Sequence, residues 1–177
     1  MNTGRRLETL HRILFENSDQ QLYAVLDGAS VPNLRSLLVQ HEIPNVCLLR
    51  GELDPELAQT APYLMELSPQ SPFTKLLLAQ GMGNHWGILA HANDDFRTLR
   101  MHFRKILTVW DPDGKPLHFR YYDPRVLRDY LPTCNAEELP LLFGPVTTYF
   151  AESDTADVLS RFSFTGDTLG QQQLTLS

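Results

Sequence analysis

Cysteine is scarce in this 177-residue sequence, which contains only Cys47 and Cys134. The two lie far apart, so their number and spacing exclude a disulfide-rich framework. Cys47 lies within the apolar run from Val46 to Leu49, where a free cysteine behaves as a small hydrophobic side chain. We therefore expect two free thiols and a reducing compartment.

Long hydrophobic runs are absent as well. The longest purely aliphatic run extends from Leu76 to Ala79, far below the roughly 20 residues of a membrane-spanning helix. Arg5 and Arg6 precede a mixed stretch rather than an apolar block, which argues against a signal peptide. These features predict a cytoplasmic protein without membrane insertion.

Lysine is rare, with three lysines against twelve arginines, and the formal net charge is -6. A negative balance argues against nucleic acid as the main partner, because phosphate neutralisation needs a basic surface. Arginine carries a planar guanidinium that pairs with carboxylates through two hydrogen bonds. Its excess favours ion pairs within the fold and at protein interfaces.

Helical and strand patterns roughly alternate along the chain. Leu7, Leu10 and Leu14 share one helix face, and the apolar segment 45–50 has the pattern of a central strand. Trp86, Ile88 and other alternate residues of segment 84–91 are expected on one face of a strand. The patterns predict a single α/β domain with an α+β tendency over residues 1–160, with its motif-bearing core at about 20–150. Expected strands are 21–29, 45–50, 63–67, 84–91 and 146–151, and expected helices begin near positions 32, 54, 73, 93, 123 and 135.

A β-hairpin is predicted near residues 106–122. Asp111-Pro112-Asp113-Gly114 has type I turn chemistry and lies between two short strand segments. A hairpin favours a mixed rather than an all-parallel sheet, with helices packed on it. The polar residues 161–177 are expected to form a C-terminal tail, loosely ordered or lying along a partner from Gly166 onward.

Templates for metal and phosphate chemistry are missing from the sequence. His85 and His91 lie six residues apart on one expected strand, a separation of roughly 20 Å that one metal ion cannot bridge. No CxxC, HExxH or GxSxG motif occurs. Gly81-Met82-Gly83 precedes an expected strand rather than a helix, unlike a phosphate-binding loop. We expect no metal, no cofactor and no enzymatic activity.

The segment from Phe119 to Arg125 is the most prominent cluster of charged residues, and it has two interpretations. In one, Asp123 caps a helix that begins with proline, while Arg120 and Arg125 pair with carboxylates such as Asp27. In the other, Asp27 and Asp123 form an acid/base pair, with a nearby His118, in a small hydrolase or transferase. The Asp-Pro helix start explains Asp123 without catalysis and favours the first.

The aromatic residues also divide into two groups. Trp86, Phe119 and Tyr121 are expected in the core. Tyrosine is enriched at interfaces, so Tyr122, together with Tyr63 and Tyr149, is a candidate for presenting a hydroxyl at an edge or interface.

A series of short motifs occurs in order along the chain: YAVLDGA (23–29), LLRG (48–51), APYL (61–64), WG (86–87), HFR (102–104), FRYYDPRVL (119–127) and FGP (143–145). This series resembles the bacterial domain of unknown function 4123 family of type VI secretion effector adaptors, or chaperones. The resemblance covers roughly residues 20 to 150, and FRYYDPRVL following an HxR helix is its most specific part.

This resemblance implies a non-catalytic adaptor that binds a protein effector, a toxin, and helps to load it on the tip of the secretion spike (VgrG). An immunity-type protein that blocks the toxin is a further alternative. The resemblance implies no catalytic residue. It places Arg50, Arg120, Tyr122, Asp123 and Arg125 in a partner-binding or motif network, and Asp27, Trp86, His102 and Arg104 in the structural motif.

Overall fold

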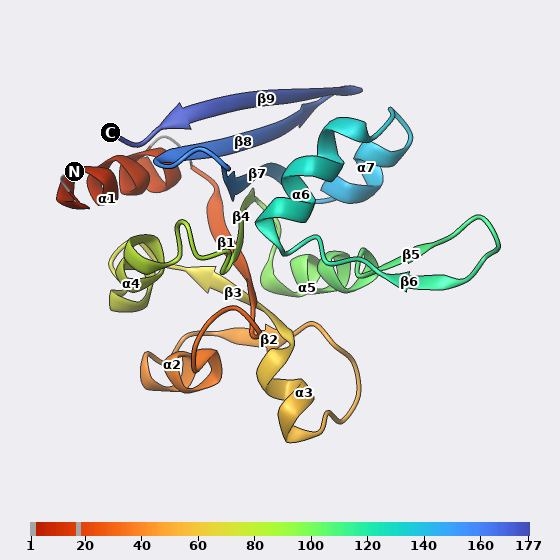
Figure 1. The fold of residues 1–177 in the computed structure, drawn as a ribbon, viewed down its shortest axis with the longest axis horizontal. Coiled ribbons are helices and arrows are strands. Elements are labelled where there is room, and N and C mark those ends of the chain that lie inside the picture. Colours follow the sequence, from red (N-terminus) through yellow and green to blue (C-terminus); the bar gives the residue numbers. More distant parts are fainter. Residues whose placement is uncertain (1–2, 17–18) are drawn as a thin grey trace.

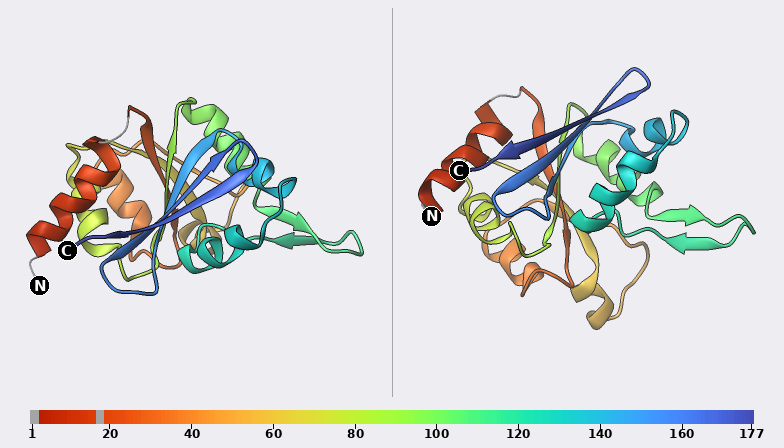
Figure 2. Two further views of the ribbon diagram at one scale, coloured as in Figure 1. Left: turned by 90° about the horizontal axis from the view of Figure 1, so that it is seen from above. Right: turned by 45° about the horizontal axis from the view of Figure 1, so that its top comes forward.

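A seven-stranded antiparallel sheet forms the middle layer of the molecule, with helices on both faces (Figure 1, Figure 2). The structure is a computed structural model that describes residues 3–16 and 19–177. The strand order is β2-β3-β1-β4-β7-β8-β9, and β5 and β6 form a separate two-stranded hairpin. The strands are β1 (Gln21–Asp27), β2 (Asn45–Cys47), β3 (Pro62–Leu67), β4 (Gly87–Ala92), β5 (Thr108–Trp110), β6 (Pro116–His118), β7 (Val146–Glu152), β8 (Val158–Thr165) and β9 (Thr168–Thr175).

Seven α-helices occur in the described part of the chain, and most of them are short. The first continues into a π-helical turn, Arg12–Glu16, and the sixth into a 3-10 turn, Leu131–Thr133. The helices are α1 (Thr3–His11), α2 (Leu34–Gln40), α3 (Pro55–Thr60), α4 (Pro72–Gln80), α5 (Phe96–Lys105), α6 (Pro124–Tyr130) and α7 (Glu138–Phe143).

Strand β1 lies in the interior of the sheet, antiparallel to β3 on one side and to β4 on the other. Its side chains alternate between two hydrophobic cores. Tyr23 and Val25 pack in the core covered by α5, α6 and α7, and Leu22 and Leu26 pack in the core covered by α1, α2 and α4. Both faces of β1 are therefore buried, which explains its nearly continuous apolar sequence.

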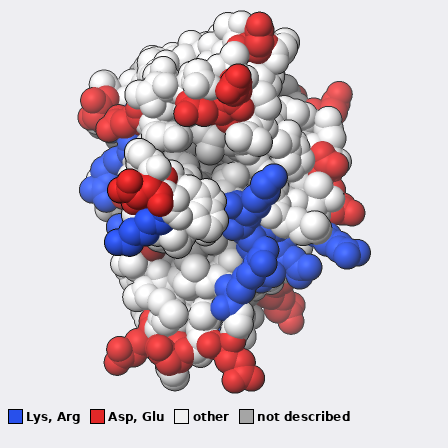
Figure 3. All heavy atoms as spheres, turned by 90° about the vertical axis from the view of Figure 1, so that its right-hand side faces the viewer, with Lys and Arg blue, Asp and Glu red and all other residues white. Residues whose placement is uncertain are grey.

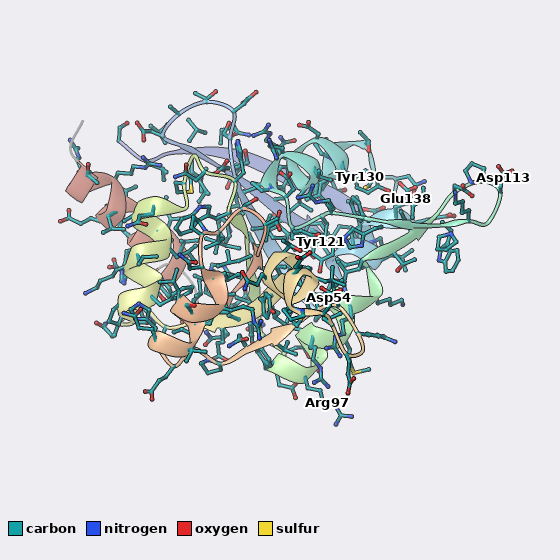
Figure 4. The ribbon with its side chains drawn as sticks, turned by 60° about the horizontal axis from the view of Figure 1, so that its bottom comes forward. Asp54, Arg97, Asp113, Tyr121, Tyr130 and Glu138 are labelled. Carbon is teal, nitrogen blue, oxygen red and sulfur yellow. The ribbon has the colours of Figure 1, made fainter. Side chains whose placement is uncertain are left out.

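The core under α5 to α7 is rich in aromatic rings, and the hydroxyl groups of its buried tyrosines Tyr121 and Tyr149 are hydrogen-bonded. The Tyr121 hydroxyl donates to the Phe103 carbonyl at 2.7 Å, and Figure 4 shows Tyr121 in the interior. The Tyr149 hydroxyl donates to the Leu142 carbonyl at 2.7 Å. The core assignment of Tyr121 is thus confirmed, but the edge assignment of Tyr149 is wrong because this residue is fully buried.

The expected alternation around Trp86 is partly wrong. Strand β4 begins at Gly87, so Trp86 precedes the regular alternation and packs in the opposite core from Ile88. The core assignment of Trp86 itself is confirmed. The following helix, α5, is capped by Asp95, whose side chain accepts from the Thr98 amide at 2.8 Å.

Segment 45–50 is not a central strand. Its regular part, β2, is three residues long and lies at the end of the sheet, paired with β3. Leu48 follows β2 and is buried. The apolar composition of this segment therefore reflects the packing of individual side chains rather than a central place in the sheet.

Residues 161–177 do not form a loosely ordered tail. Strands β8 and β9 pair along eight residues each and extend the sheet beyond β7. Phe162 and Leu176 are completely buried, whereas most side chains of β9 are exposed because this strand lies at the other end of the sheet. An end strand with exposed side chains can have a polar sequence. The polar composition of this segment therefore led to the wrong expectation of a tail.

The single α/β domain and the predicted hairpin are confirmed. Strands β5 and β6 project from the body of the molecule on the side opposite α1 (Figure 1). All strand pairs within the described residues are antiparallel, so the sheet that the sequence led us to expect as mixed has no parallel pair there, in keeping with the α+β tendency. Both cysteines are free thiols. In the described residues, we find no helix with the length and apolarity that membrane crossing requires.

Candidate functional site

Asp27 ends strand β1 and is held by three donors, although its side chain is only 2% exposed. Its Oδ1 accepts from the Ala29 amide at 2.9 Å. Its Oδ2 accepts from the Ser30 hydroxyl at 3.1 Å and from Arg120 Nη2 at 2.8 Å. A buried carboxylate is costly unless it is paired in this way. Arg120 therefore neutralises Asp27, as the sequence predicted.

Asp123 caps helix α6 and binds Arg125 with both carboxylate oxygens. Oδ1 accepts from the Arg125 amide and from Arg125 Nε, both at 3.0 Å, and Oδ2 accepts from Nη2 at 2.8 Å. Burial raises the pKa of Asp123, but the hydrogen bonds and charge of Arg125 outweigh it and hold this pKa below its ordinary value. Arg125 thus pairs with Asp123 rather than with Asp27.

Tyr122 and His118 continue the polar chain from Asp27. The Arg120 guanidinium lies 5.8 Å from the centre of the Tyr122 ring, within cation–π range. The Tyr122 hydroxyl lies 3.0 Å from His118 Nε2, and only 4% of Tyr122 is exposed. Burial, and then the charge of Asp27, raise the pKa of Tyr122. The edge assignment of Tyr122 is therefore wrong, because its ring is packed under Arg120. We call Asp27, Arg120, Tyr122 and His118 the Asp27 network.

Burial and the neighbouring Arg120 charge lower the pKa of His118. Neutral imidazole is compatible with a hydrogen bond to the Tyr122 hydroxyl. Both carboxylates of the catalytic interpretation, Asp27 and Asp123, are bound to arginine. Among residues 3–16 and 19–177, no group of three or more His, Cys, Asp or Glu is arranged to hold a metal ion.

His102 and Arg104 lie on α5, away from the Asp27 network. His102 Nε2 donates to the Leu142 carbonyl at 3.1 Å, and burial lowers the pKa of His102 to about 4. The ring lies against Gly144, where an added Cβ would come within 2.5 Å of His102 Nδ1. Arg104 Nη2 donates to the Cys47 carbonyl at 2.8 Å and so joins α5 to β2. His102 thus connects α5 to α7, and Arg104 connects α5 to β2.

The remaining motif residues, Trp86 and Arg50, have different surroundings. The Trp86 carbonyl accepts from the Asp27 amide at 2.8 Å, which connects it to the end of β1. Arg50 is exposed in the segment after β2, and no ion pair of it occurs within the described residues. The structure thus brings Asp27, Trp86, Arg120 and Tyr122 together and leaves Arg50 apart.

An open groove of about 890 Å³ lies between α2, β2 and α3. Within the described part of the chain, no Asp, Glu or His lines it, and neither Asp27 nor Asp123 borders it. Apolar residues on its helices are exposed, notably Val39 at 78% and, on neighbouring α3, Leu57 at 43%. The sequence analysis did not predict this groove. The apolar residues Val39 and Leu57 on short helices were a local signal of an exposed apolar surface there. Its lining includes Arg35, Leu38, Val39, Asn45, Cys47, Leu49, Leu53, Ala58 and Tyr63.

Tyr63 is an edge candidate whose hydroxyl is already engaged. It donates to the Ala58 carbonyl at 2.6 Å and so connects β3 to α3. Tyr63 is only 6% exposed, and its burial is the main cause of its raised pKa. The hydroxyl therefore shapes the floor of the groove, and its expected presentation at an edge is wrong.

Residues 22–141 match the family model described as Domain of unknown function (DUF4123). The chain belongs to this family. The match extends from β1 into α7, so it includes the Asp27 network, the groove and the β5–β6 hairpin, whereas strands β7, β8 and β9 follow it. No curated protein and no solved structure matches the chain.

Proposed function

We propose that this DUF4123 protein is a non-catalytic adaptor that binds a type VI secretion effector in the cytoplasm and helps to load it on the secretion spike (VgrG). The open groove between α2, β2 and α3 carries the proposal. It is large enough for several side chains of a protein segment, and its lining combines apolar residues with amide groups. None of the described residues that line it carries a carboxylate or an imidazole for acid/base catalysis.

The place of the groove in the fold also suits a protein ligand. Asn45 and Cys47 of β2 line it, and β2 is an end strand of the sheet. End strands are recurrent sites at which an extended peptide segment is added. A bound effector segment would lie along β2, between the exposed side of α2 and α3.

The Asp27 network supports the adaptor over the hydrolase or transferase alternative. A general acid or base must reach the substrate proton. Asp27 accepts hydrogen bonds from three donors, and both carboxylate oxygens of Asp123 accept from the Arg125 guanidinium. Turnover that is lost in a folded Asp123→Asn variant would favour the enzyme instead.

Co-expression with a type VI secretion effector from a neighbouring gene tests the proposal. We expect a stable complex and more soluble effector. Val39→Asp should abolish co-purification without unfolding the protein, because Val39 is 78% exposed. Leu141→Asp on α7, at a site 62% exposed, is the matched control and should retain the complex.

Two outcomes would contradict the adaptor. One is failure to co-purify with either the effector or the spike protein. The other is neutralisation of the toxin without promotion of its export, which would identify an immunity-type protein.

A further inference from the structure

Helix α5 carries a basic face that the proposed function does not use. It buries Leu99 and Phe103 in the core, leaves Arg97 and Lys105 exposed, and holds Arg100 and Arg104 half-buried. Arg97 points away from the helix into solvent (Figure 4). Figure 3 shows Lys and Arg side chains gathered on the side of the molecule from which the β5–β6 hairpin projects. The basic residues of α5 are Arg97, Arg100, Arg104 and Lys105.

These positive charges are balanced only in part, because Asp95 lies near Arg97 and Arg104 donates to the Cys47 carbonyl. None of the ion pairs formed among the described residues includes a basic residue of α5. Asp95, at the start of the helix, is used as its N-cap. Arg97, Arg100 and Arg104 are spaced three and four residues apart, so their like charges repel each other. The whole chain has a net charge of -6, so a helix with this many positive charges differs in sign from the rest of the protein.

Exposed apolar side chains accompany the charges. Met101, within the basic face, is 60% exposed, and Trp110, on the projecting hairpin that follows α5, is 67% exposed. Leu117 on β6 is 45% exposed. Tryptophan, methionine and arginine are the residue types enriched in protein–protein interfaces, and tryptophan and arginine dominate their binding energy. This composition indicates an interface rather than a solvated helix face.

We propose that α5 and the β5–β6 hairpin form a docking face for an acidic protein segment. The arginine guanidinium groups would pair with carboxylates of the partner in two-point hydrogen bonds, and Trp110 would insert between its apolar side chains. A protein segment fits better than nucleic acid, because the net charge is negative and an exposed indole and thioether accompany the cations.

The docking face is distinct from the groove. Helix α5 covers one core, with Leu99 and Phe103, whereas α2 covers the other, with Leu34 and Leu38. The two surfaces approach each other at β2, where Arg104 donates to the carbonyl of Cys47, a residue that lines the groove. The proposal itself rests on α5 and the hairpin alone, and it does not depend on the identity of an effector.

Fluorescence anisotropy with a short dye-labelled peptide of alternating Glu and Leu tests the docking face, using the protein without other partners. We expect saturable binding that weakens with added salt. The double variant Arg97→Glu/Arg100→Glu should weaken binding about tenfold or more, because two attractive pairs become repulsive. Trp110→Ala should also weaken it, whereas Arg161→Glu on β8 should not. Equal melting temperatures would show that all variants are folded.

Three results would overturn the proposal. The first is equal binding of a control peptide in which Gln replaces Glu. The second is unchanged affinity in the double variant. The third is stronger binding of a single-stranded oligonucleotide that displaces the peptide, which would make this a nucleic-acid site. None of these results depends on whether an effector co-purifies in the test of the groove.

Discussion

Arg120 Nη2 lies 2.8 Å from Asp27 Oδ2, although 93 residues separate the two in the chain. The contact joins the end of β1 to the segment that leads into α6. It places the charge of a half-exposed arginine, with 49% of its side chain accessible, against a carboxylate with 2% accessible. The pair thus connects two motifs of the sequence, YAVLDGA (23–29) and FRYYDPRVL (119–127), through one ion pair.

Removing Arg120 should destabilise the protein. Arg120→Ala leaves Asp27 with only the Ala29 and Ser30 donors, and we expect a loss of about 1–3 kcal/mol in the free energy of unfolding. The loss is smaller than for a fully buried pair because solvent screens Arg120. Urea denaturation measures it. In a double-mutant cycle, Asp27→Asn should reduce the effect of Arg120→Ala, and strictly additive effects would show that the pair is not coupled.

Asp123 should make stability depend on acid pH. Its pKa is below the ordinary value of 3.8, so folding is favoured above that value, and this contribution is lost as the pH falls through the lowered pKa. Asp123→Ala should cost about 1 kcal/mol at pH 7, because α6 loses its N-cap. The difference from the wild type should shrink below pH 4 in urea titrations. A constant difference between pH 7 and pH 3 would contradict the assignment.

His102 should destabilise the fold in mildly acidic solution. Its pKa falls from an ordinary 6.5 to about 4, so below pH 6.5 the unfolded chain binds a proton that the folded protein does not. Stability should therefore decrease as the pH falls from 6.5 to about 4. His102→Gln keeps a donor for the Leu142 carbonyl and should flatten this part of the profile. Proton NMR titration of the His102 ring gives the pKa directly, and a value near 6.5 would contradict the prediction.

Two glycines with positive φ should differ in their tolerance of a side chain. Gly144 has φ +50° and ψ -119° and faces His102, whereas Gly114, in the hairpin turn, has φ +77° and no atom near an added Cβ. Gly114→Ala should cost only the positive-φ backbone strain, about 1–2 kcal/mol. Gly144→Ala combines a backbone conformation outside the left-handed helical region with a clash against the His102 ring and should cost about 2–4 kcal/mol. Thermal unfolding measures both, and equal losses would contradict this order.

Local signals in the sequence predicted much of the fold and part of the site. Asp123 before Pro124 predicted an N-cap, and the cap is present. The helix expected near position 135 is also present, and Asn135 and Glu138 form a reciprocal capping box before it, in which each side chain accepts from the backbone amide of the other at 2.9 Å. These features are encoded within a few residues. Their geometry therefore does not depend on how distant segments pack.

Features that depend on distant segments were missed. The end position of β2 is set by its pairing with β3 and not by its own apolar composition. Strand β9 is polar because it lies at an end of the sheet with most of its side chains exposed, and only its pairing with β8 places it there. The groove exists only because α2 and α3 are placed on either side of β2, and no local pattern contains that arrangement.

The two ends of the described chain lie close together and far from the hairpin. Arg6 Nε lies 3.2 Å from Asp157 Oδ1, and the Leu176 amide donates to the Asp157 carbonyl at 2.8 Å, so α1 lies beside the end of β9 (Figure 1). An affinity tag or a fluorescent fusion at either terminus would emerge on the same side. A molecule immobilised through such a tag would present β5, β6 and Trp110 outward to the solution.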